Sequence, residues 1–322
     1  AEIERDLAQA RERGLILVGE SQPAALHALA HALNAVLGAA GRTVEYAPDF
    51  DEDRPAHLDS IRGLAQACAA GTIDTLLILG GNPAYDAPAD LQFAAALDHV
   101  EMAAHLTLYE NETSLGCDWT LPRAHFLEEW GDGLAHDGSW SQRQPLIEPL
   151  YRGRSPVELL AQAIGGGPAR GYDIARETFR SAWGETDFEA RWRQALHDGG
   201  VAESAPPAIL PALRPNAEWV RDLAASNPPQ AESLELVFAP DYRLWDGRYA
   251  NNGWLQELPD PITKLVWGNP ALLAPATAES LGLRNGVLIA VPVPAEAEVP
   301  SQRLEAAIAS ALEDAQARGI EG

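Results

Sequence analysis

The strongest constraint in this sequence is a series of short, continuously apolar runs that alternate with helix-forming stretches and end at glycines or polar turns. The runs expected to be strands are 15–19, 43–47, 75–79, 103–109 and 115–121, and the helices expected between them are 23–37, 57–70 and 88–100. Strands that are apolar along their whole length are typical of a parallel sheet covered on both faces. The pattern therefore predicts an α/β fold in which residues 1–165 form a doubly wound parallel sheet.

The rest of the chain predicts three further regions. Residues 166–232 predict a helical and proline-rich linking segment that contains one aromatic-bearing helix. Residues 233–297 hold short apolar runs, at 234–238 and within 263–290, which predict a partial C-terminal β-barrel. Residues 298–322 predict a helical tail. The expected architecture is a Rossmann-like domain, a linker, a partial barrel and a C-terminal helix.

The charge balance excludes one class of partner. Acidic side chains outnumber basic ones by 47 to 23, which gives a formal net charge of −24. A chain this acidic repels phosphate backbones, so we expect no nucleic-acid partner. Because no run of about 18 apolar residues occurs, we expect no transmembrane segment in the chain. The chain begins with Ala1, which predicts a trimmed product or a piece of a longer polypeptide.

The cysteines and histidines limit the metal chemistry and the catalysis that this chain can perform. Cys68 and Cys117 are too few for a four-cysteine iron–sulfur or zinc site, and two buried thiols are favoured over one disulfide. His27 and His31 lack a third ligand nearby, and glycines surround His136-Asp137, so surface and turn roles are favoured. We therefore expect neither metal ligands nor catalytic residues in the chain.

Two polar motifs follow predicted strands. Gly80-Gly81-Asn82-Pro83 follows the third strand, and Asn111-Glu112-Thr113 follows the fourth. Doubly wound sheets bind ligands beyond the carboxyl ends of their strands, so both motifs are expected at one crevice. Glycines let a ligand approach the backbone, although the G-x-G-x-x-G and G-x-x-x-x-G-K patterns are absent. A tight turn without a ligand is the alternative for Gly80-Gly81-Asn82-Pro83.

Tryptophans are crowded in two places. The crowded residues are Trp119, Trp130 and Trp140, and then Trp245, Trp254 and Trp267. Aromatic side chains with a polar group are enriched at protein interfaces. We expect this chain to pack against a large partner, with half of these tryptophans in the core as the alternative.

Several longer motifs occur in one order along the chain. They are 79–83, 111–113 before 117–122, 251–261 and 277–286. In this order they resemble the molybdopterin oxidoreductase family, the large subunits of complex iron–sulfur molybdoenzymes. Through Trp130-Gly131-Asp132 and 144–151 the chain is most similar to a fragment of the iron–sulfur, molybdopterin-like subunit of alternative complex III. The resemblance covers about residues 5–290.

The resemblance implies a role in respiration. It implies a non-catalytic, molybdopterin-like scaffold portion of an electron-transfer subunit, in a quinol-oxidising complex on the periplasmic face of a bacterial membrane. It implies a relict pterin-nucleotide crevice formed by Gly80-Gly81-Asn82-Pro83, Asn111-Glu112-Thr113 and Asn252. No cofactor is expected in this chain. The iron–sulfur clusters are expected in a missing ferredoxin-like portion, and the other partners are cytochrome c and quinol-binding membrane subunits.

Two other functions stay open from the residues alone. In the first, the chain is part of a molybdopterin-dependent oxidoreductase whose site is completed by other sequence or subunits, and it then binds a pterin dinucleotide. In the second, it is an acidic α/β interaction protein without a redox role.

Overall fold

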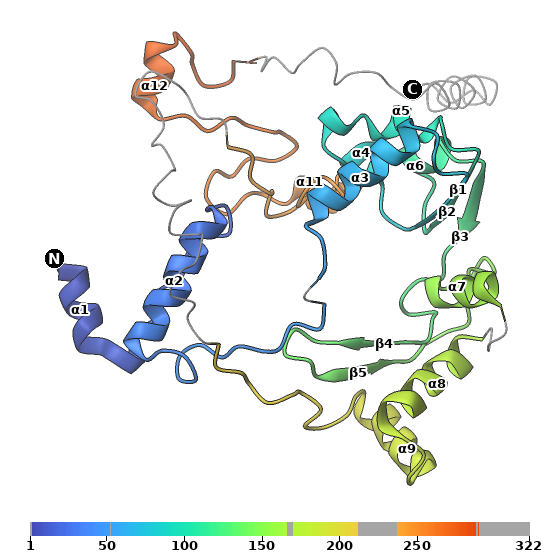
Figure 1. Cartoon of the computed structure of the whole chain (residues 1–322). Helices are drawn as coiled ribbons and strands as arrows, with labels where there is room; N and C mark the ends of the chain where they lie inside the picture. Colours follow the sequence, from blue (N-terminus) through green and yellow to red (C-terminus); the bar gives the residue numbers. More distant parts are fainter. Residues whose placement is uncertain (1, 52, 166–169, 212–236, 288, 290–322) are drawn as a thin grey trace, which may run out of the picture. The chain divides into compact units, whose positions relative to one another are not determined.

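The structure is a computed structural model that describes residues 2–51, 53–165, 170–211, 237–287 and 289 (Figure 1). The helices are α1 (Glu2–Ala10), the 3₁₀ helix η1 (Arg11–Arg13), α2 (Ala24–Leu37), α3 (His57–Ala69), α4 (Pro83–Asp86), the 3₁₀ helix η2 (Ala89–Leu91), α5 (Phe93–Leu97), α6 (Glu112–Leu115), α7 (Pro156–Ile164), α8 (Gly171–Trp183), α9 (Phe188–Asp198), α11 (Gly253–Glu257) and α12 (Pro275–Ser280). The strands are β1 (Thr75–Leu79), β2 (Met102–Thr107), β3 (Trp119–Pro122), β4 (Gly131–Leu134) and β5 (Trp140–Arg143).

The chain divides into two compact units, each built from separate stretches of sequence. Unit 1 comprises Ala1–Arg54, Glu129–Leu146 and Gly166–Ala239, and unit 2 comprises Pro55–Glu128, Ile147–Gly165 and Pro240–Gly322. The predicted domain boundaries at 165, 232 and 297 fall at or beside residues outside the described part. The predicted division into domains therefore stays a prediction.

Unit 2 contains a parallel sheet of three strands in the order β1-β2-β3. Leu77 of β1 lies opposite Ala104 of β2, and Leu106 of β2 lies opposite Leu121 of β3. Each connection between these strands contains at least one helix, as parallel pairing requires. The predicted α/β class with a parallel sheet is therefore confirmed for these three strands.

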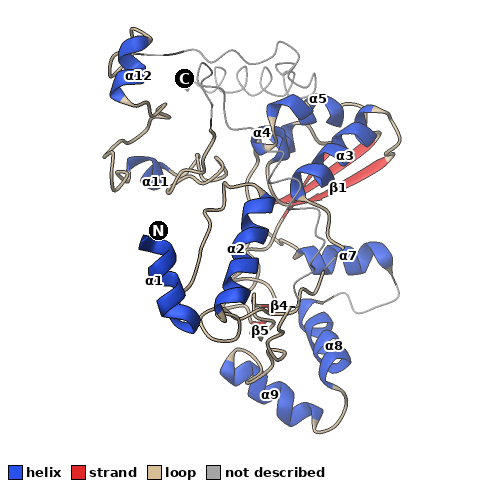
Figure 2. Cartoon of the chain, turned by 60° about the vertical axis from the view of Figure 1, so that its left-hand side comes forward, coloured by secondary structure: helices blue, strands red, loops and turns tan. Residues whose placement is uncertain are grey.

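The core of unit 2 is formed by α3, α5 and apolar side chains of the sheet. Cys68 of α3 packs with Phe93 and Leu97 of α5, and all three are buried. Figure 2 shows α3 beside β1. Cys117 is partly buried against the same core, and both cysteines are free thiols. Burial of apolar surface, at about 25 cal/mol per Å², is what fixes these helices on the sheet.

The first two predicted strands do not join this sheet, which corrects the expected five strands. Residues 15–19 are irregular, because the side chain of Asn34 pairs with the backbone of Ile16 where a strand would pair. Asn34 Oδ1 accepts from the Ile16 N–H at 2.8 Å, and Nδ2 donates to the Ile16 carbonyl at 2.9 Å. Residues 43–47 make only isolated bridges. An apolar run favours burial but does not supply a neighbouring strand.

Two predicted elements begin or end differently in unit 2. The helix expected over 88–100 is divided at Gln92, which has a left-handed conformation with φ +46° and ψ +43°. The last predicted strand starts later, at Trp119, because a capping box between Asn111 and Ser114 first nucleates α6. Local capping outweighs the apolar run here.

Unit 1 is held by an aromatic core between α8, α9 and the tryptophan that precedes β4. Phe179 and Trp192 are each 1% exposed. The ring of Trp130 lies 4.9 Å from that of Tyr172 and 6.5 Å from that of Trp192, measured between centroids. The antiparallel pair of β4 and β5 completes the unit's regular structure. The aromatic-bearing helix predicted in the linking segment is confirmed as α9.

The partial β-barrel predicted for 233–297 is not found in the described residues of that range. Residues 237–287 and 289 contain α11, α12 and loops, and no strand. Trp245, Lys264 and Trp267 adopt positive φ angles, which interrupt the extended backbone that a strand needs. Most of the strand predicted at 234–238, and the whole predicted tail, lie outside the described residues.

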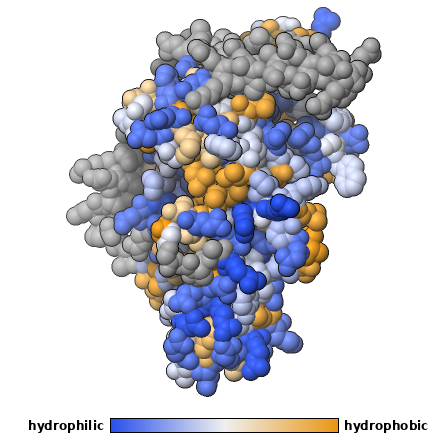
Figure 3. All heavy atoms as spheres, turned by 90° about the vertical axis from the view of Figure 1, so that its right-hand side faces the viewer, coloured by the Kyte–Doolittle hydropathy of each residue, from blue (hydrophilic) through white to orange (hydrophobic). Residues whose placement is uncertain are grey.

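Exposed apolar groups are prominent on this chain. Figure 3 shows one face on which hydrophilic side chains predominate and apolar ones gather in separate patches. Within the described part, none of the helices combines the length and apolar character needed to cross a membrane. Large exposed apolar groups mark candidate surfaces for protein partners.

Candidate functional site

The two polar motifs predicted at the strand ends meet in unit 2. Asn82, which follows β1, donates through Nδ2 to Glu112 Oε2 at 2.6 Å. Its Oδ1 accepts from the N–H and the hydroxyl of Thr113 at 3.1 and 2.9 Å. The Thr113 hydroxyl oxygen also accepts from the Ala84 N–H at 3.0 Å. The side chain of Asn82 therefore joins the ends of β1 and β2.

Asn111 extends this network from the start of α6. Its Nδ2 donates to the Gly81 carbonyl at 3.5 Å, and its Oδ1 accepts from the Ser114 N–H at 3.1 Å. Gly80 and Gly81 turn the chain with φ of +89° and +79°, a conformation that costs glycine least. Pro83 then begins α4. All the predicted site residues of the two motifs therefore lie together.

Asn252 is the predicted site residue that is not hydrogen-bonded to either of the two strand-end motifs in the described part of the chain. Its Oδ1 accepts from the Leu255 N–H at 3.2 Å and so caps α11. Its own N–H donates to the Tyr249 carbonyl at 2.9 Å. These bonds give Asn252 a local structural role.

His105 is a buried group at this site that the sequence analysis missed. It lies in β2 with 0% exposure, and its Nδ1 is 3.0 Å from Ser114 Oγ. Burial lowers the pKa of His105 because the charged ring would lose its hydration, and the Gly81 carbonyl opposes this shift. The available signal was a histidine inside an apolar strand. A neutral His105 ties β2 to the cap of α6.

Asp86, at the end of α4, is a second group that the sequence analysis missed. Burial raises the pKa of Asp86, the charge of Asp246 raises it further, and Arg248 lowers it. Glu112 also raises the pKa of this carboxyl. Asp246 and Arg248 form an ion pair at 2.6 Å. Local sequence carried no signal for this cluster, because its members are far apart along the chain.

No metal site is apparent in the part of the chain that the structure describes. Within it, no group of three or more His, Cys, Asp or Glu side chains is arranged to hold a metal ion. His31 Nδ1 instead lies 2.9 Å from the Tyr46 hydroxyl. Asp137 Oδ1 accepts from the Ser139 N–H at 2.9 Å, so the predicted turn at His136-Asp137 is confirmed.

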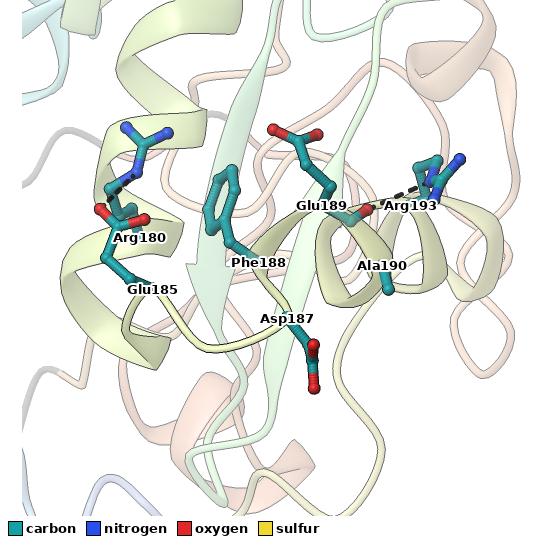
Figure 4. Close-up of a pocket in the computed structure, with 7 residues that line it drawn as sticks. All are labelled: Arg180, Glu185, Asp187, Phe188, Glu189, Ala190 and Arg193. Atoms are coloured by element: carbon teal, nitrogen blue, oxygen red, sulfur yellow. Dashed lines mark hydrogen bonds and ion pairs between the residues drawn. The ribbon is translucent and has the colours of Figure 1, made fainter.

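A shallow hollow of about 480 Å³ lies beside α8 and α9 in unit 1 (Figure 4). It is lined by Arg180, Glu185, Asp187, Phe188, Glu189, Ala190 and Arg193. The Arg180 guanidinium lies 4.3 Å from the centre of the Phe188 ring and pairs with Glu185 at 3.0 Å. Arg193 Nε donates to the Glu189 carbonyl at 3.2 Å. Because these arginines are already satisfied by the protein, the hollow is a weak candidate for a ligand site.

The tryptophans separate into core and surface groups. Trp130 and Trp140 are partly buried and pack against the aromatic core of unit 1, so their expected role at an interface stays a prediction. Trp119, Trp254 and Trp267 are 61%, 88% and 62% exposed. The alternative, in which half of the crowded tryptophans belong to the core, fits Trp130 and Trp140 better than it fits the exposed tryptophans.

Comparison with known families corrects the resemblance to molybdopterin oxidoreductases. The family model that matches is described as Indigoidine synthase A like protein, and it covers residues 270–322. It gives no evidence for the molybdopterin oxidoreductase family, so that resemblance and the assignment to a respiratory chain are wrong. The pterin-nucleotide role of the strand-end residues rested on that resemblance, and it stays untested.

The matched segment covers well under half of the chain, and most of it lies outside the described residues. No curated protein matches the sequence. Within the described part of the match lies α12. The chain is therefore similar to Indigoidine synthase A like protein over residues 270–322.

Proposed function

We propose that this chain is a non-catalytic, acidic α/β interaction protein that serves as a scaffold for a larger assembly. The carrying observation is the aromatic segment, defined as residues 240–267 of unit 2. Four of its large apolar side chains are strongly exposed: Tyr242 at 86%, Trp254 at 88%, Ile262 at 82% and Trp267 at 62%. Exposed Trp and Tyr side chains are the residue types that most often dominate binding energy at protein interfaces.

The aromatic segment is held in shape by polar contacts. Arg243, which is only 7% exposed, pairs with Asp241 at 3.0 Å. It also donates to the carbonyls of Leu258 and Leu265 at 3.0 and 2.9 Å. One guanidinium thus fixes three parts of the segment that are distant in sequence. A preordered loop loses less entropy on binding, which favours affinity.

Other turns of the segment are fixed in the same way. The carboxylate of Asp260 accepts from the N–H groups of Ile262 and Thr263 at 2.9 and 2.6 Å. These bonds hold the backbone where Ile262 projects into solvent. The segment therefore presents apolar side chains from a backbone that is satisfied locally.

The charges define the chemistry of the partner. Basic and acidic residues nearly balance within 240–267, whereas the whole chain has a formal net charge of −24. The partner that fits is a protein with an apolar, pocketed centre and a basic rim. Charge attraction speeds the encounter, and burial of the aromatic rings supplies most of the affinity.

The strand-end network supports a structural role for the sheet. The polar side chains of this network form hydrogen bonds with one another and with nearby backbone groups; they belong to Asn82, Thr113 and Asn111. The three parallel strands also support the proposal that unit 2 belongs to the doubly wound, Rossmann-like class. In this proposal the sheet carries the segment that binds.

The experiment replaces one exposed tryptophan of the segment and one outside it. Partners are identified by proximity labelling with the full chain, and their binding constants are then measured. Trp254→Ala should weaken binding at least tenfold, since interface anchors contribute about 2 kcal/mol or more. Trp119→Ala is the control, because Trp119 is also largely exposed, at 61%, but lies on β3. Equal binding by wild type and Trp254→Ala, or an equal loss in the control, would refute the proposal.

A further inference from the structure

β1 is an open edge of the parallel sheet in unit 2. It is one of the two outer strands, because the strand order is β1-β2-β3 (Figure 1). In β1, Thr75 is exposed and the other residues are partly exposed, whereas most residues of the central strand β2 are buried. This difference is expected for a strand that has a neighbour on one side only.

The pairing register shows which backbone groups of β1 point away from the sheet. The Met102 N–H donates to the Asp74 carbonyl at 2.9 Å as β1 begins, so the even-numbered residues of β1 direct their backbone groups to β2. Successive residues of a strand direct these groups to opposite sides. The N–H and C=O groups of the odd-numbered residues Thr75, Leu77 and Leu79 therefore point outward.

These outward groups have no neighbouring strand within the described residues. There, none of the N–H and C=O groups of Thr75, Leu77 and Leu79 is hydrogen-bonded to another protein group. The described strands are otherwise engaged, because β4 pairs with β5 and β3 pairs with β2. Edge strands are usually protected by charged residues or proline, and Thr75–Leu79 contains neither. An edge of this kind is a template for another strand.

The opposite edge of the sheet is protected. β3 is short and ends with Pro122, which has no N–H to offer. The Arg154 N–H donates to the outward carbonyl of Pro122 at 3.0 Å, and Arg154 forms a bridge with Arg123. Pairing between chains through β1 should therefore stop at two copies.

We propose that β1 pairs antiparallel with β1 of a second copy of this chain, about a twofold axis at Leu77. The two parallel sheets then form one continuous sheet. Leu77 lies opposite Leu77 of the second copy, and Thr75 lies opposite Leu79 of the second copy. All three residues take hydrogen-bonded positions of the antiparallel ladder, so every outward N–H of β1 meets an outward carbonyl. A twofold contact of this kind is self-complementary and closed.

The side chains and charges of β1 fit a second copy. Leu76 and Ile78 pack on the apolar core of unit 2, and each lies opposite the other across the twofold axis. Apolar pairs across neighbouring strands stabilise a sheet. Although each chain has a formal net charge of −24, β1 has no charged residue, and Asp74 lies opposite Gly80 of the second copy. No like charges therefore oppose each other along the paired strands.

The size of the contact sets its strength. A pair of short strands buries less than the roughly 1,200 Å² at which stable, specific interfaces begin. We therefore expect a weak dimer, with a dissociation constant of about 1 to 100 µM. Because the two acidic chains repel each other at long range, added salt should strengthen the association.

Sedimentation equilibrium of the full chain across this concentration range tests the proposal, and the wild type should change from monomer to dimer. Thr75→Pro removes one outward N–H from each copy and should raise the dissociation constant at least about tenfold. Thr120→Pro is the matched control, because Thr120 is also an exposed threonine of an outer strand. Its N–H points outward like the carbonyl of Pro122, two residues further along β3. This control should dimerise like the wild type.

A charge exchange at position 77 tests the register. The twofold axis places this position opposite itself, so Leu77→Lys alone and Leu77→Glu alone each oppose like charges and should stay monomeric. An equimolar mixture of the two variants opposes unlike charges and should recover the dimer. If either variant fails to fold, as judged by hydrogen exchange in β2, the comparison of Thr75→Pro with Thr120→Pro decides the question.

Three results would overturn the proposal. They are a wild-type chain that stays monomeric up to about 100 µM, an equal loss of dimer in Thr120→Pro, and folded position-77 variants whose mixture associates no better than either alone. Trp254→Ala should leave the dimer unchanged, because Trp254 belongs to the aromatic segment and not to β1. Self-association through β1 is therefore distinguishable from the proposed function.

Discussion

Replacing Trp192 by alanine should remove the largest anchor of unit 1. Trp192 is 1% exposed, and its ring lies 5.2 Å from the Phe179 ring and 6.0 Å from the Tyr172 ring. Its Nε1 also donates to the Tyr172 hydroxyl at 3.3 Å. The substitution therefore removes apolar burial, two aromatic contacts and one hydrogen bond at once.

The expected cost follows from these contacts. Tryptophan-to-alanine changes in protein cores destabilise by about 3 to 5 kcal/mol, and more when the site cannot collapse. Phe179, Tyr172 and Trp130 are large and rigid, so the cavity should stay open, and we expect a value near the upper end. Trp192→Phe keeps most of the volume and loses the indole hydrogen bond, so its cost should be about 1 to 2 kcal/mol.

Hydrogen exchange on the full chain is the suitable assay, because two compact units need not unfold in one step. Protection in α8 and α9 should fall by roughly three to four orders of magnitude in Trp192→Ala. Trp254→Ala, 88% exposed, should change stability by no more than about 0.5 kcal/mol. A cost below about 1 kcal/mol for Trp192→Ala would show that the aromatic core is not as described.

Three further predictions concern titratable groups. Burial lowers the pKa of His105, so as the pH falls the unfolded chain takes up the proton before the folded chain does. The free energy of unfolding should therefore decrease as the pH falls below 6.5. His105→Gln should reduce this decrease, as measured by denaturant titrations at several pH values. The hydrogen bond from Arg243 lowers the pKa of Asp241 to about 2, so the stability it contributes should be full above pH 3.8 and should disappear toward pH 2; an unchanged acid profile in Asp241→Asn would contradict this. Burial raises the pKa of the Cys68 thiol, so iodoacetamide should modify the less buried Cys117 first, and mass spectrometry that finds Cys68 modified first would disprove it.

Much of the candidate site was predictable from the order of strands and turns. Gly80-Gly81-Asn82-Pro83 and Asn111-Glu112-Thr113 meet because the carboxyl ends of neighbouring parallel strands lie at one edge of a sheet. His105 and Asp86 were not predicted as parts of the site. Their importance depends on burial and on neighbours that are distant in the sequence, which no local pattern reveals.

The sequence by itself determined the elements whose signals are local. The apolar run at β1, the glycine that ends α2 and the aromatic spacing of α9 each specify a conformation within a few residues. Only the tertiary structure decided which elements pair. The side chain of Asn34 forms hydrogen bonds with the backbone of Ile16, so residues 15–19 stay outside the sheet. Arg243 donates hydrogen bonds to two backbone carbonyls and so holds 240–267 as a loop instead of barrel strands. The physical reason is that hydrophobic pattern sets which residues avoid water, whereas strand pairing depends on hydrogen-bond partners that only the folded chain brings together.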